Sequence, residues 1–369
     1  MHPRRPTQKD IAVLAKVHYS VVCRALQNHP SIPAVTRERV QKIADEIGYR
    51  PDPTLSALAA YRSSLRPPAF QGQLAWLTSS DPGTKWDRVD VFAEYMQSAT
   101  AQASRHGYNL MDYGLDAPSM TPRRLASIMK ARNVHGILIC PQPGRTSVID
   151  LPWENFSAVT LGHALTHPHL HVVSADHYRS TRHIFQKLRQ LGYRRIGLAI
   201  PPDLNARLGG DFLAAYLMEQ QAVPANARLE PFLDASELMR PRLASWLRKT
   251  KPDALMTTNY GYPDCLMQLG VKIPDDVGVA VLFKKIRNDD FAGIDQNPKT
   301  VAIVATNILV SMIQRSERGV APLAQHIKVE GTWVDGWSVR QVGPPVSCLF
   351  AVEMSQAPPT TPDGRRPRG

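Results

Sequence analysis

The sequence predicts an all-α helix-turn-helix headpiece followed by a larger α/β core of two lobes. Two observations lead to this prediction. The first sixty residues show short helical patterns and an excess of basic residues, whereas from residue 72 onward apolar strand patterns alternate with helical ones. A chain of 369 residues is also too long for one small core, so two or three folded units are expected.

Charge and composition narrow the function. The formal net charge is +12, and about half of this excess lies in residues 1–66, where eleven Lys and Arg face five Asp and Glu. A basic region of this kind is typical of nucleic-acid binding. No apolar run reaches the roughly 18 residues of a membrane span, and the N-terminus lacks a signal-peptide pattern. The four cysteines show no metal-ligand spacing, so we expect a cytoplasmic protein without a cofactor.

Three helices are expected in the headpiece (residues 1–50), at about 7–15, 19–26 and 34–47. Thr7 and Asp10 form a capping-box pattern at the start of the first helix, and Gly48 suits the end of the third. The expected buried positions are Ile11, Ala12, Leu14, Ala15, Val22, Ala25, Leu26, Val40, Ile43, Ala44 and Ile47. Two short helices around a tight turn, with a third behind them, are typical of helix-turn-helix DNA binding. A small bundle that only mediates dimerisation is the alternative.

Residues 51–71 are predicted to form a hinge helix and a linker. Pro51 and Pro53 end the preceding helix, and residues 54–61 can form about two helical turns. Because so short a helix is marginal in water, it needs a partner. The alternative is a linker whose leucines pack on the core.

From residue 72 to residue 343 the pattern predicts the α/β core. Strands are expected at 73–77, 108–113, 134–140, 156–161, 172–173, 195–200, 254–257 and 277–283, and helices at 91–106, 122–131, 180–191, 213–220, 237–248, 264–269 and 306–315. Such alternation argues for parallel sheets covered on both faces. The strands are too many for one sheet, so two Rossmann-like lobes are expected. Residues 344–369 read as a flexible tail.

A set of residues with fixed spacing runs through the headpiece: Thr7, Lys9, Asp10, Ile11, Ala12, Leu14, Ala15, Val17, Val22, Arg24, Leu26 and the runs at 36–40 and 48–51. This set resembles the DNA-binding headpiece of the LacI/GalR family of transcriptional regulators. Residues 72 to about 342 resemble the family's periplasmic-binding-protein-like core more loosely, through the runs at 106–108, 191–197 and 331–339. The resemblance implies a homodimer that binds a pseudo-palindromic operator in double-stranded DNA.

The resemblance also implies roles for single residues of the headpiece. Tyr19, Ser20 and Val21 would read bases, and Arg24 would add a groove contact. Phosphate contacts are implied for Thr7, Gln27, Ser31, Thr36 and Tyr49. In the family a hinge-helix leucine wedges into the minor groove, and Leu58 matches it, with Leu55 placed in the same DNA-binding set.

Four residues of the headpiece depart from the family pattern. Lys16 stands where Gly is usual, so the turn is expected to adopt a conformation that a side chain tolerates. His18 and Pro33 replace the usual caps of the second and third helices, and Cys23 replaces a Ser. Weaker capping, by roughly 1 kcal/mol at each cap, is expected.

An effector cleft is implied between the lobes, at the carboxyl ends of the strands. The candidate residues are Ser79, Ser80, Asp81, Trp86, Asp176, Tyr178, Arg207, Asn259 and Tyr260. Arg and Asn side chains would hold hydroxyls or a carboxylate, and the aromatic rings could stack on a sugar. Tyr260 and the lysines at 284 and 285 stand where the family usually has acidic residues. An acidic or phosphorylated sugar is therefore a candidate beside a neutral monosaccharide.

The core sequence also contains a histidine cluster that could suggest a metal site. His163, His167, His169 and His171 are close in sequence, but Pro168 interrupts them, and an interlobe loop without metal is expected. The sequence contains no GxSxG, HExxH or P-loop motif, so no catalytic residues are assigned. We therefore expect a transcriptional regulator, of the repressor type, that responds to a sugar-like effector. The alternatives are a similar regulator controlled by a protein partner, and an enzyme or binding protein with a basic adaptor.

Overall fold

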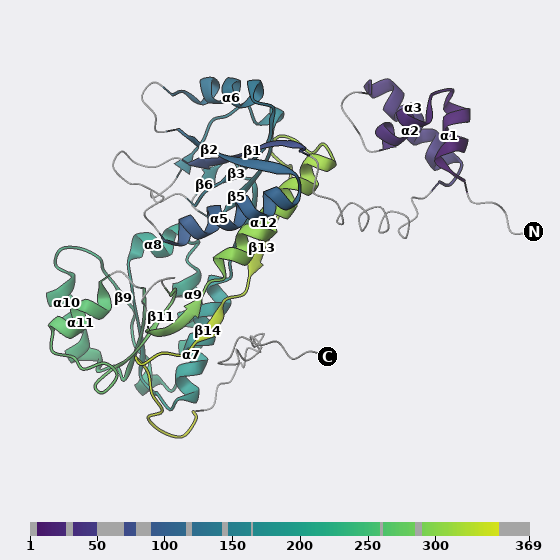
Figure 1. Cartoon of the computed structure of the whole chain (residues 1–369). Coiled ribbons are helices and arrows are strands. Elements are labelled where there is room, and N and C mark those ends of the chain that lie inside the picture. The colour runs from purple at the N-terminus through teal and green to yellow at the C-terminus, as the bar shows by residue number, and fades with distance from the viewer. Residues whose placement is uncertain are drawn as a thin grey trace, which may run out of the picture.

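The computed structural model describes residues 6–26, 32–49, 70–78, 90–115, 120–141, 147–163, 165–258, 261–284 and 290–346. The predicted hinge helix and the C-terminal tail lie outside these ranges. Three units are considered in turn: the headpiece, drawn in purple in Figure 1, and the two lobes of the core.

The headpiece consists of α1 (Gln8–Ala15), α2 (Tyr19–Leu26) and α3 (Ala34–Glu46), close to the predicted spans. Its core contains Ile11, Ala15, Val22, Ala25, Ile32, Val40 and Ala44. The expected burial of Leu14 is wrong, because its side chain is 55% exposed. Within the described residues α1 packs against α2 and α3, and its buried positions are Ile11 and Ala15, which leaves Leu14 on the outer side.

The ends of the headpiece helices follow their sequence signals, with one exception. The backbone N–H and the hydroxyl of Thr7 both donate to Asp10 Oδ2, at 2.7 Å each, as the capping-box pattern predicts. Gly48 ends α3 with φ of 67°. The prediction for the α1–α2 turn is wrong, because Lys16 takes the left-handed conformation (φ 52°, ψ 42°) that glycine favours. For a residue with a Cβ this conformation costs roughly 1 kcal/mol.

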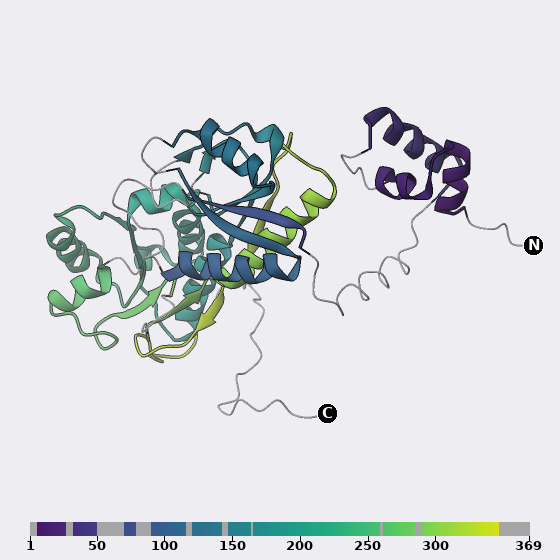
Figure 2. The same cartoon turned by 45° about the horizontal axis from the view of Figure 1, so that its top comes forward.

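The first lobe is a parallel six-stranded sheet in the order β13-β7-β5-β3-β1-β2. Its strands are β1 (Gly72–Thr78), β2 (Tyr108–Gly114), β3 (Val134–Ile139), β5 (Ser157–Leu161), β7 (His171–Ala175) and β13 (His326–Val329). The helices α5 (Asp90–Arg105) and α12 (Pro298–Gln314) lie side by side on one face, and α6 (Pro122–Ala131) covers the other (Figures 1 and 2). A separate ribbon pairs β4 (Ser147–Val148) with β6 (Leu165–His167).

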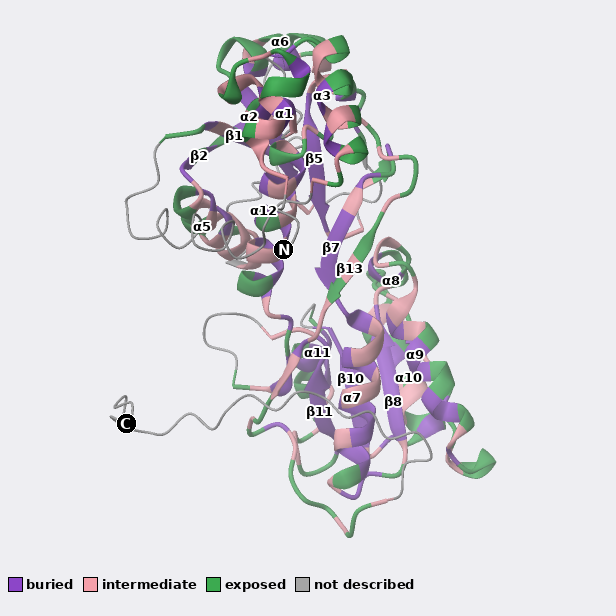
Figure 3. Cartoon of the chain, turned by 90° about the vertical axis from the view of Figure 1, so that its right-hand side faces the viewer, coloured by how far each residue is buried: buried purple, intermediate pink, exposed green. Residues whose placement is uncertain are grey.

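The second lobe has a six-stranded sheet in the order β14-β12-β11-β10-β8-β9, in which β14 alone is antiparallel to its neighbour. Its strands are β8 (Ile196–Ile200), β9 (Phe232–Leu233), β10 (Ala254–Thr257), β11 (Gly278–Val281), β12 (Ala292–Asp295) and β14 (Thr332–Val334). The helices are α7 (His177–Gln190), α8 (Pro202–Arg207), α9 (Asp211–Gln221), α10 (Met239–Thr250) and α11 (Tyr262–Gln268). The strands β8 and β10 are buried between these helices (Figure 3).

The chain passes between the lobes three times. Asp176 joins β7 to α7, residues 296–297 join β12 to α12, and residues 330–331 join β13 to β14. The predicted fold class, with an all-α headpiece and two Rossmann-like lobes, is confirmed. Across the described ranges, no helix has the length and apolar character needed to cross a bilayer.

Candidate DNA interface and interlobe site

The helix α2 presents two of the predicted base-reading residues on its outer side. Tyr19 is 48% exposed and Arg24 is exposed, whereas Val22 and Ala25 are fully buried against α1 and α3. The buried pair fixes the rotation of α2 about its axis, so the opposite side of the helix faces outward. Val21 is half-buried and packs against the headpiece core, which limits what it can offer a base.

His18 caps the N-terminus of α2 through its side chain. The backbone N–H of Ser20 donates to His18 Nδ1 at 3.3 Å, and Ser20 Oγ lies 2.9 Å from the same nitrogen. The sequence predicted weaker capping at His18, and the structure shows that an imidazole nitrogen takes the place of the hydroxyl oxygen as the capping acceptor. At α3 the expectation holds, since Pro33 makes no side-chain capping bond.

The other predicted DNA contacts are only partly described. Thr36 and Tyr49 are half-buried, and Tyr49 packs against the headpiece core. The backbone N–H and the hydroxyl of Thr7 both donate to Asp10, so in this conformation neither is available to donate to a phosphate. Gln27, Ser31, Leu55 and Leu58 lie outside the described residues.

Arg24 is anchored at one end of its guanidinium group. Its Nε donates to the carbonyl oxygen of Ser20 at 3.2 Å. This bond leaves the two terminal nitrogens to donate outward, which is the geometry that suits O6 and N7 of guanine.

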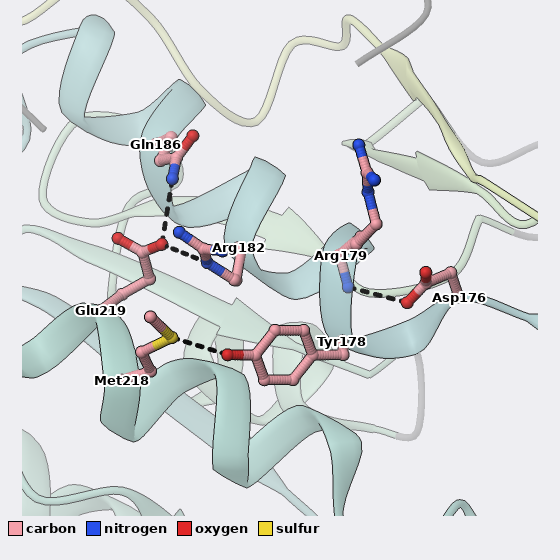
Figure 4. Close-up of polar contacts among 7 residues, drawn as sticks. All are labelled: Asp176, Tyr178, Arg179, Arg182, Gln186, Met218 and Glu219. Atoms are coloured by element: carbon pink, nitrogen blue, oxygen red, sulfur yellow. Dashed lines mark hydrogen bonds and ion pairs between the residues drawn. The ribbon is translucent and has the colours of Figure 1, made fainter. Parts of the chain in front are cut away.

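Of the nine candidate effector residues, the structure describes Asp176, Tyr178 and Arg207. Asp176 is buried, and its Oδ1 accepts the backbone N–H of Arg179 at 3.0 Å, so it caps α7. The Tyr178 hydroxyl donates to Met218 Sδ at 2.6 Å, from α7 to α9 (Figure 4). Arg207 lies at the end of α8. Asp176 and Tyr178 therefore have structural contacts: Asp176 caps α7, and Tyr178 links α7 to α9.

Beneath Tyr178 an ion pair joins α7 to α9. Glu219 Oε1 accepts from Arg182 Nε at 2.7 Å and from Gln186 Nε2 at 2.9 Å, and the glutamate is 2% exposed (Figure 4). Buried charges need such partners because desolvation is costly. This cluster fixes the helix that begins at the first crossover.

The sequence did not reveal the polar contacts that join the lobes. Lys328 on β13 pairs with Asp211 at the start of α9, with 2.8 Å between Nζ and Oδ2. Nearby, His163 Nε2 lies 3.0 Å from Ser174 Oγ, and the rings of His163 and His326 are 5.7 Å apart. Because β13 was not predicted, Lys328 and His326 could not be placed beside residues more than a hundred positions away.

His177 is the most perturbed histidine of this region. Burial lowers its pKa to about 4, so the imidazole is neutral near pH 7. Asp211 raises the pKa slightly, whereas His163 and Lys328 lower it further. Its ring packs against Phe212, with 5.1 Å between centroids, and Nδ1 has no hydrogen-bond partner among the described residues.

Other buried polar atoms also lack a hydrogen-bond partner among the described residues, and three of them are Ser180 Oγ, Thr258 Oγ1 and Gln296 Oε1. Thr258 and Gln296 follow β10 and β12 directly, at the carboxyl ends of parallel strands. A buried polar group left unpaired costs roughly 1–3 kcal/mol, and this edge is where open α/β sheets bind ligands. These atoms are therefore the candidate ligand contacts that the sequence missed.

In the ranges that the structure describes, no three His, Cys, Asp or Glu residues are close enough to hold a metal ion. Of the four histidines close in sequence, His167 and His169 are exposed and their ring centroids lie 6.2 Å apart. A groove of about 300 Å³ on the first lobe is lined by residues of α5 and α12, and it contains none of the candidate effector residues.

The headpiece matches a known protein family. Residues 7–52 match the family model of bacterial regulatory proteins of the lacI family. The chain is 23% identical to the HTH-type transcriptional regulator KdgR of Bacillus subtilis (strain 168), over 74% of this chain and 80% of that protein. It is 24% identical to the HTH-type transcriptional regulator TreR of Escherichia coli (strain K12), over 69% of this chain and 78% of that protein.

Two solved structures have a similar fold. The transcriptional regulator CelR–cellobiose complex matches with a TM-score of 0.52 and 17% identity, over 91% of this chain and 100% of that one. A lac repressor dimer bound to operator and the anti-inducer ONPF matches with a TM-score of 0.50 and 17% identity, over 91% and 99% of the two chains. At this identity the similarity concerns the fold.

Proposed function

The chain belongs to the LacI family of bacterial regulatory proteins, and we propose that it controls transcription by binding an operator as a homodimer and by responding to a sugar-like effector. The observation that carries this proposal is α2: a capped helix, locked by Val22 and Ala25, that exposes Tyr19 and Arg24. The protein is a regulator, not an enzyme.

Two kinds of contact contribute to operator binding: phosphate contacts position the headpiece, and base contacts select the DNA sequence. The basic headpiece attracts the phosphate backbone, and this attraction weakens as salt rises. Base edges in the major groove then meet Tyr19, Ser20 and Arg24 at the start of α2. Because a homodimer carries two such helices related by a two-fold axis, its operator is a pseudo-palindrome.

The effector is proposed to bind between the lobes. Related structures contain cellobiose or sucrose, and the buried Thr258 and Gln296 atoms supply hydrogen-bonding groups at the sheet edge of the second lobe. This proposal keeps Arg207 as the cationic group. It also keeps six candidates that lie outside the described residues: Ser79, Ser80, Asp81, Trp86, Asn259 and Tyr260. A ligand that binds the closed lobes better than the open lobes shifts the equilibrium between them.

The hinge segment is proposed to transmit this shift to the DNA. Leu58, with Leu55 beside it, would insert into the minor groove only when two chains bring their hinge helices together. Lobe closure changes the separation of the two segments and so changes operator affinity. Because the operator lies on the bacterial chromosome, we propose that the protein is located in the cytoplasm.

Selection of bound sequences from a random DNA pool, with the full chain, tests the proposal. Enrichment of one pseudo-palindrome, and a change of its affinity on adding a member of a sugar, sugar-acid and sugar-phosphate panel, is the expected result. Enrichment without any sugar response would favour control by a protein partner. If the selection enriches no sequence at all, operator binding is refuted.

A further inference from the structure

We propose that His18 sets the base preference of Ser20, by fixing where the hydroxyl proton of Ser20 points. The inference rests on the proposed function, because it concerns how α2 reads an operator. In this role His18 is a positioning residue: it contacts Ser20, and Ser20 contacts the base.

Two groups of Ser20 converge on one nitrogen of the imidazole ring. The backbone N–H of Ser20 lies 3.3 Å from His18 Nδ1, and the hydroxyl oxygen lies 2.9 Å from it. A backbone N–H can only donate, so Nδ1 must present its lone pair and the ring proton must be on Nε2. Facing that lone pair, the Ser20 hydroxyl must also donate. The tautomer thus follows from the hydrogen-bond network.

The consequence concerns what Ser20 can offer to DNA. A serine hydroxyl has one proton and two lone pairs. With the proton committed to His18, only acceptor positions remain for a base. The donors in the major groove are the N6 amino group of adenine and the N4 amino group of cytosine, whereas N7, O6 and O4 are acceptors. Ser20 therefore selects an exocyclic amino group and disfavours a carbonyl oxygen at the same place.

The surroundings of Ser20 hold this arrangement in place before DNA arrives. One turn along α2, Arg24 Nε donates to the Ser20 carbonyl oxygen at 3.2 Å. The carbonyl oxygen of His18 accepts the backbone N–H of Val21 at 2.8 Å, which begins the helix at His18. Ser20 thus presents an acceptor and Arg24 presents donors from one rigid helical turn, a pattern complementary to an amino group beside a guanine edge.

The test is a double-mutant cycle with the full chain and the duplex selected from the random pool. Single adenines or cytosines in the half-site are replaced by analogues that lack the exocyclic amino group, and purines by 7-deaza analogues that lack N7. Affinities are measured for the wild type, Ser20→Ala, His18→Ala and His18→Asn. Asparagine is a good cap whose side-chain oxygen also accepts, so it is the matched replacement.

At one position, removal of the amino group is expected to weaken wild-type binding about fivefold, as for one neutral hydrogen bond. The same removal should change the affinity of Ser20→Ala and His18→Ala by less than twofold. His18→Asn should restore most of the fivefold effect, because its side-chain oxygen also accepts the hydroxyl proton of Ser20. A merely structural role for His18 would instead lower the affinity for both duplexes alike in His18→Ala and leave the fivefold ratio between them unchanged. The 7-deaza duplexes should show no coupling to Ser20.

Two results would overturn the inference alone: an amino-group effect that His18→Ala retains in full, or coupling of Ser20 to N7 instead. A wild-type chain that enriches no sequence would overturn the proposed function and the inference with it. Measuring the unfolding transition of the headpiece in each variant distinguishes a variant that fails to fold from one that folds but no longer recognises the base.

Discussion

Lys16 is the residue at which the headpiece departs most clearly from its local preferences. Its left-handed backbone (φ 52°) costs a side-chain-bearing residue roughly 1 kcal/mol. Glycine carries an entropy cost of roughly 0.5–1 kcal/mol, so Lys16→Gly should stabilise the headpiece by up to about 0.5 kcal/mol. Differential scanning calorimetry of the full chain should show a higher melting temperature for the headpiece transition.

Lys9→Gly is the matched control for that prediction. Lys9 lies inside α1, where glycine costs about 1 kcal/mol, so the same substitution should lower the melting temperature. If both variants shift the transition in the same direction, the left-handed turn is not a source of strain.

His177 makes the stability of the core depend on pH, and its burial determines that stability falls as pH decreases. Its pKa is about 4 in the native state and about 6.5 in the unfolded chain, so between these values only the unfolded state takes up the proton. Stability contributed by neutral His177 is complete above about pH 6.5 and falls, by roughly 3 kcal/mol in total, as pH decreases through the window to about pH 4.

Urea unfolding at pH 7 and pH 4.5 measures this effect. The wild type should lose more stability over that interval than His177→Gln, while His169→Gln, at an exposed histidine, should behave as the wild type. Equal losses in the wild type and His177→Gln would show that burial of His177 does not depress its pKa.

Single residues also show what the sequence could reveal. The Thr7–Asp10 capping box and Gly48 are local signals, and both predictions are confirmed. Capping by His18 was missed because an imidazole is not a usual cap. The buried unpaired atoms of Thr258 and Gln296 could not be predicted, because burial of a polar atom depends on elements distant in sequence.

At the scale of elements, the α7–α9 contact depends on one buried carboxylate. Glu219→Ala removes the group that accepts from both Arg182 and Gln186, and the loss of one partner of a buried ion pair typically costs 3–5 kcal/mol. The free energy of unfolding of the second lobe should fall by roughly 3 kcal/mol, as measured by chemical denaturation.

Glu317→Ala provides the comparison for an exposed pair. Glu317 pairs with Arg315 on the first lobe, where both side chains are about half exposed, and such pairs contribute less than about 1 kcal/mol. If Glu219→Ala and Glu317→Ala lower the free energy of unfolding by similar amounts, the ion pair between α7 and α9 contributes no more than an exposed pair.

The sequence predicted helices and strands correctly where the apolar residues show strong periodicity. It failed for short strands, whose formation depends on pairing with strands distant in sequence. The helix α6 and the strand β10 have the predicted bounds, because each has a clear pattern between turn residues. The four-residue β12 and β13 were missed, since a short strand becomes a strand only by pairing with β11 or β7. The helix α12 begins at Pro298 and not near residue 306, and proline at the first helical position marks that start.

At the scale of the whole molecule, we propose that control of DNA binding depends on the hinge segment between headpiece and core. Leu58→Ala should weaken binding to the selected operator about tenfold or more, because the lost wedge no longer helps to kink the duplex. Fluorescence anisotropy with the operator and with a scrambled duplex would measure this, and the scrambled duplex should bind the variant and the wild type alike. Unchanged operator affinity would exclude the wedge role.

The two-lobed architecture was accessible from the sequence because βα alternation is a property of the entire chain. The contacts that join the lobes were not accessible, as the Lys328–Asp211 pair illustrates. Its two residues are 117 positions apart, with Lys328 on β13 of the first lobe and Asp211 at the start of α9 of the second. The candidate effector residues share this difficulty. Their assignment depends on which loops meet across the lobes, and that is not encoded locally.

The central claim is that α2 reads DNA through its exposed side. Arg24→Ala, measured against the selected operator at fixed salt, tests it most directly, with Lys249→Ala as a control that removes one exposed positive charge from α10 of the second lobe. Arg24→Ala should cost about 1–3 kcal/mol of operator affinity, as for a good base contact, and Lys249→Ala should leave affinity unchanged. Equal affinities of Arg24→Ala and the wild type would contradict the assignment of α2 as the recognition helix.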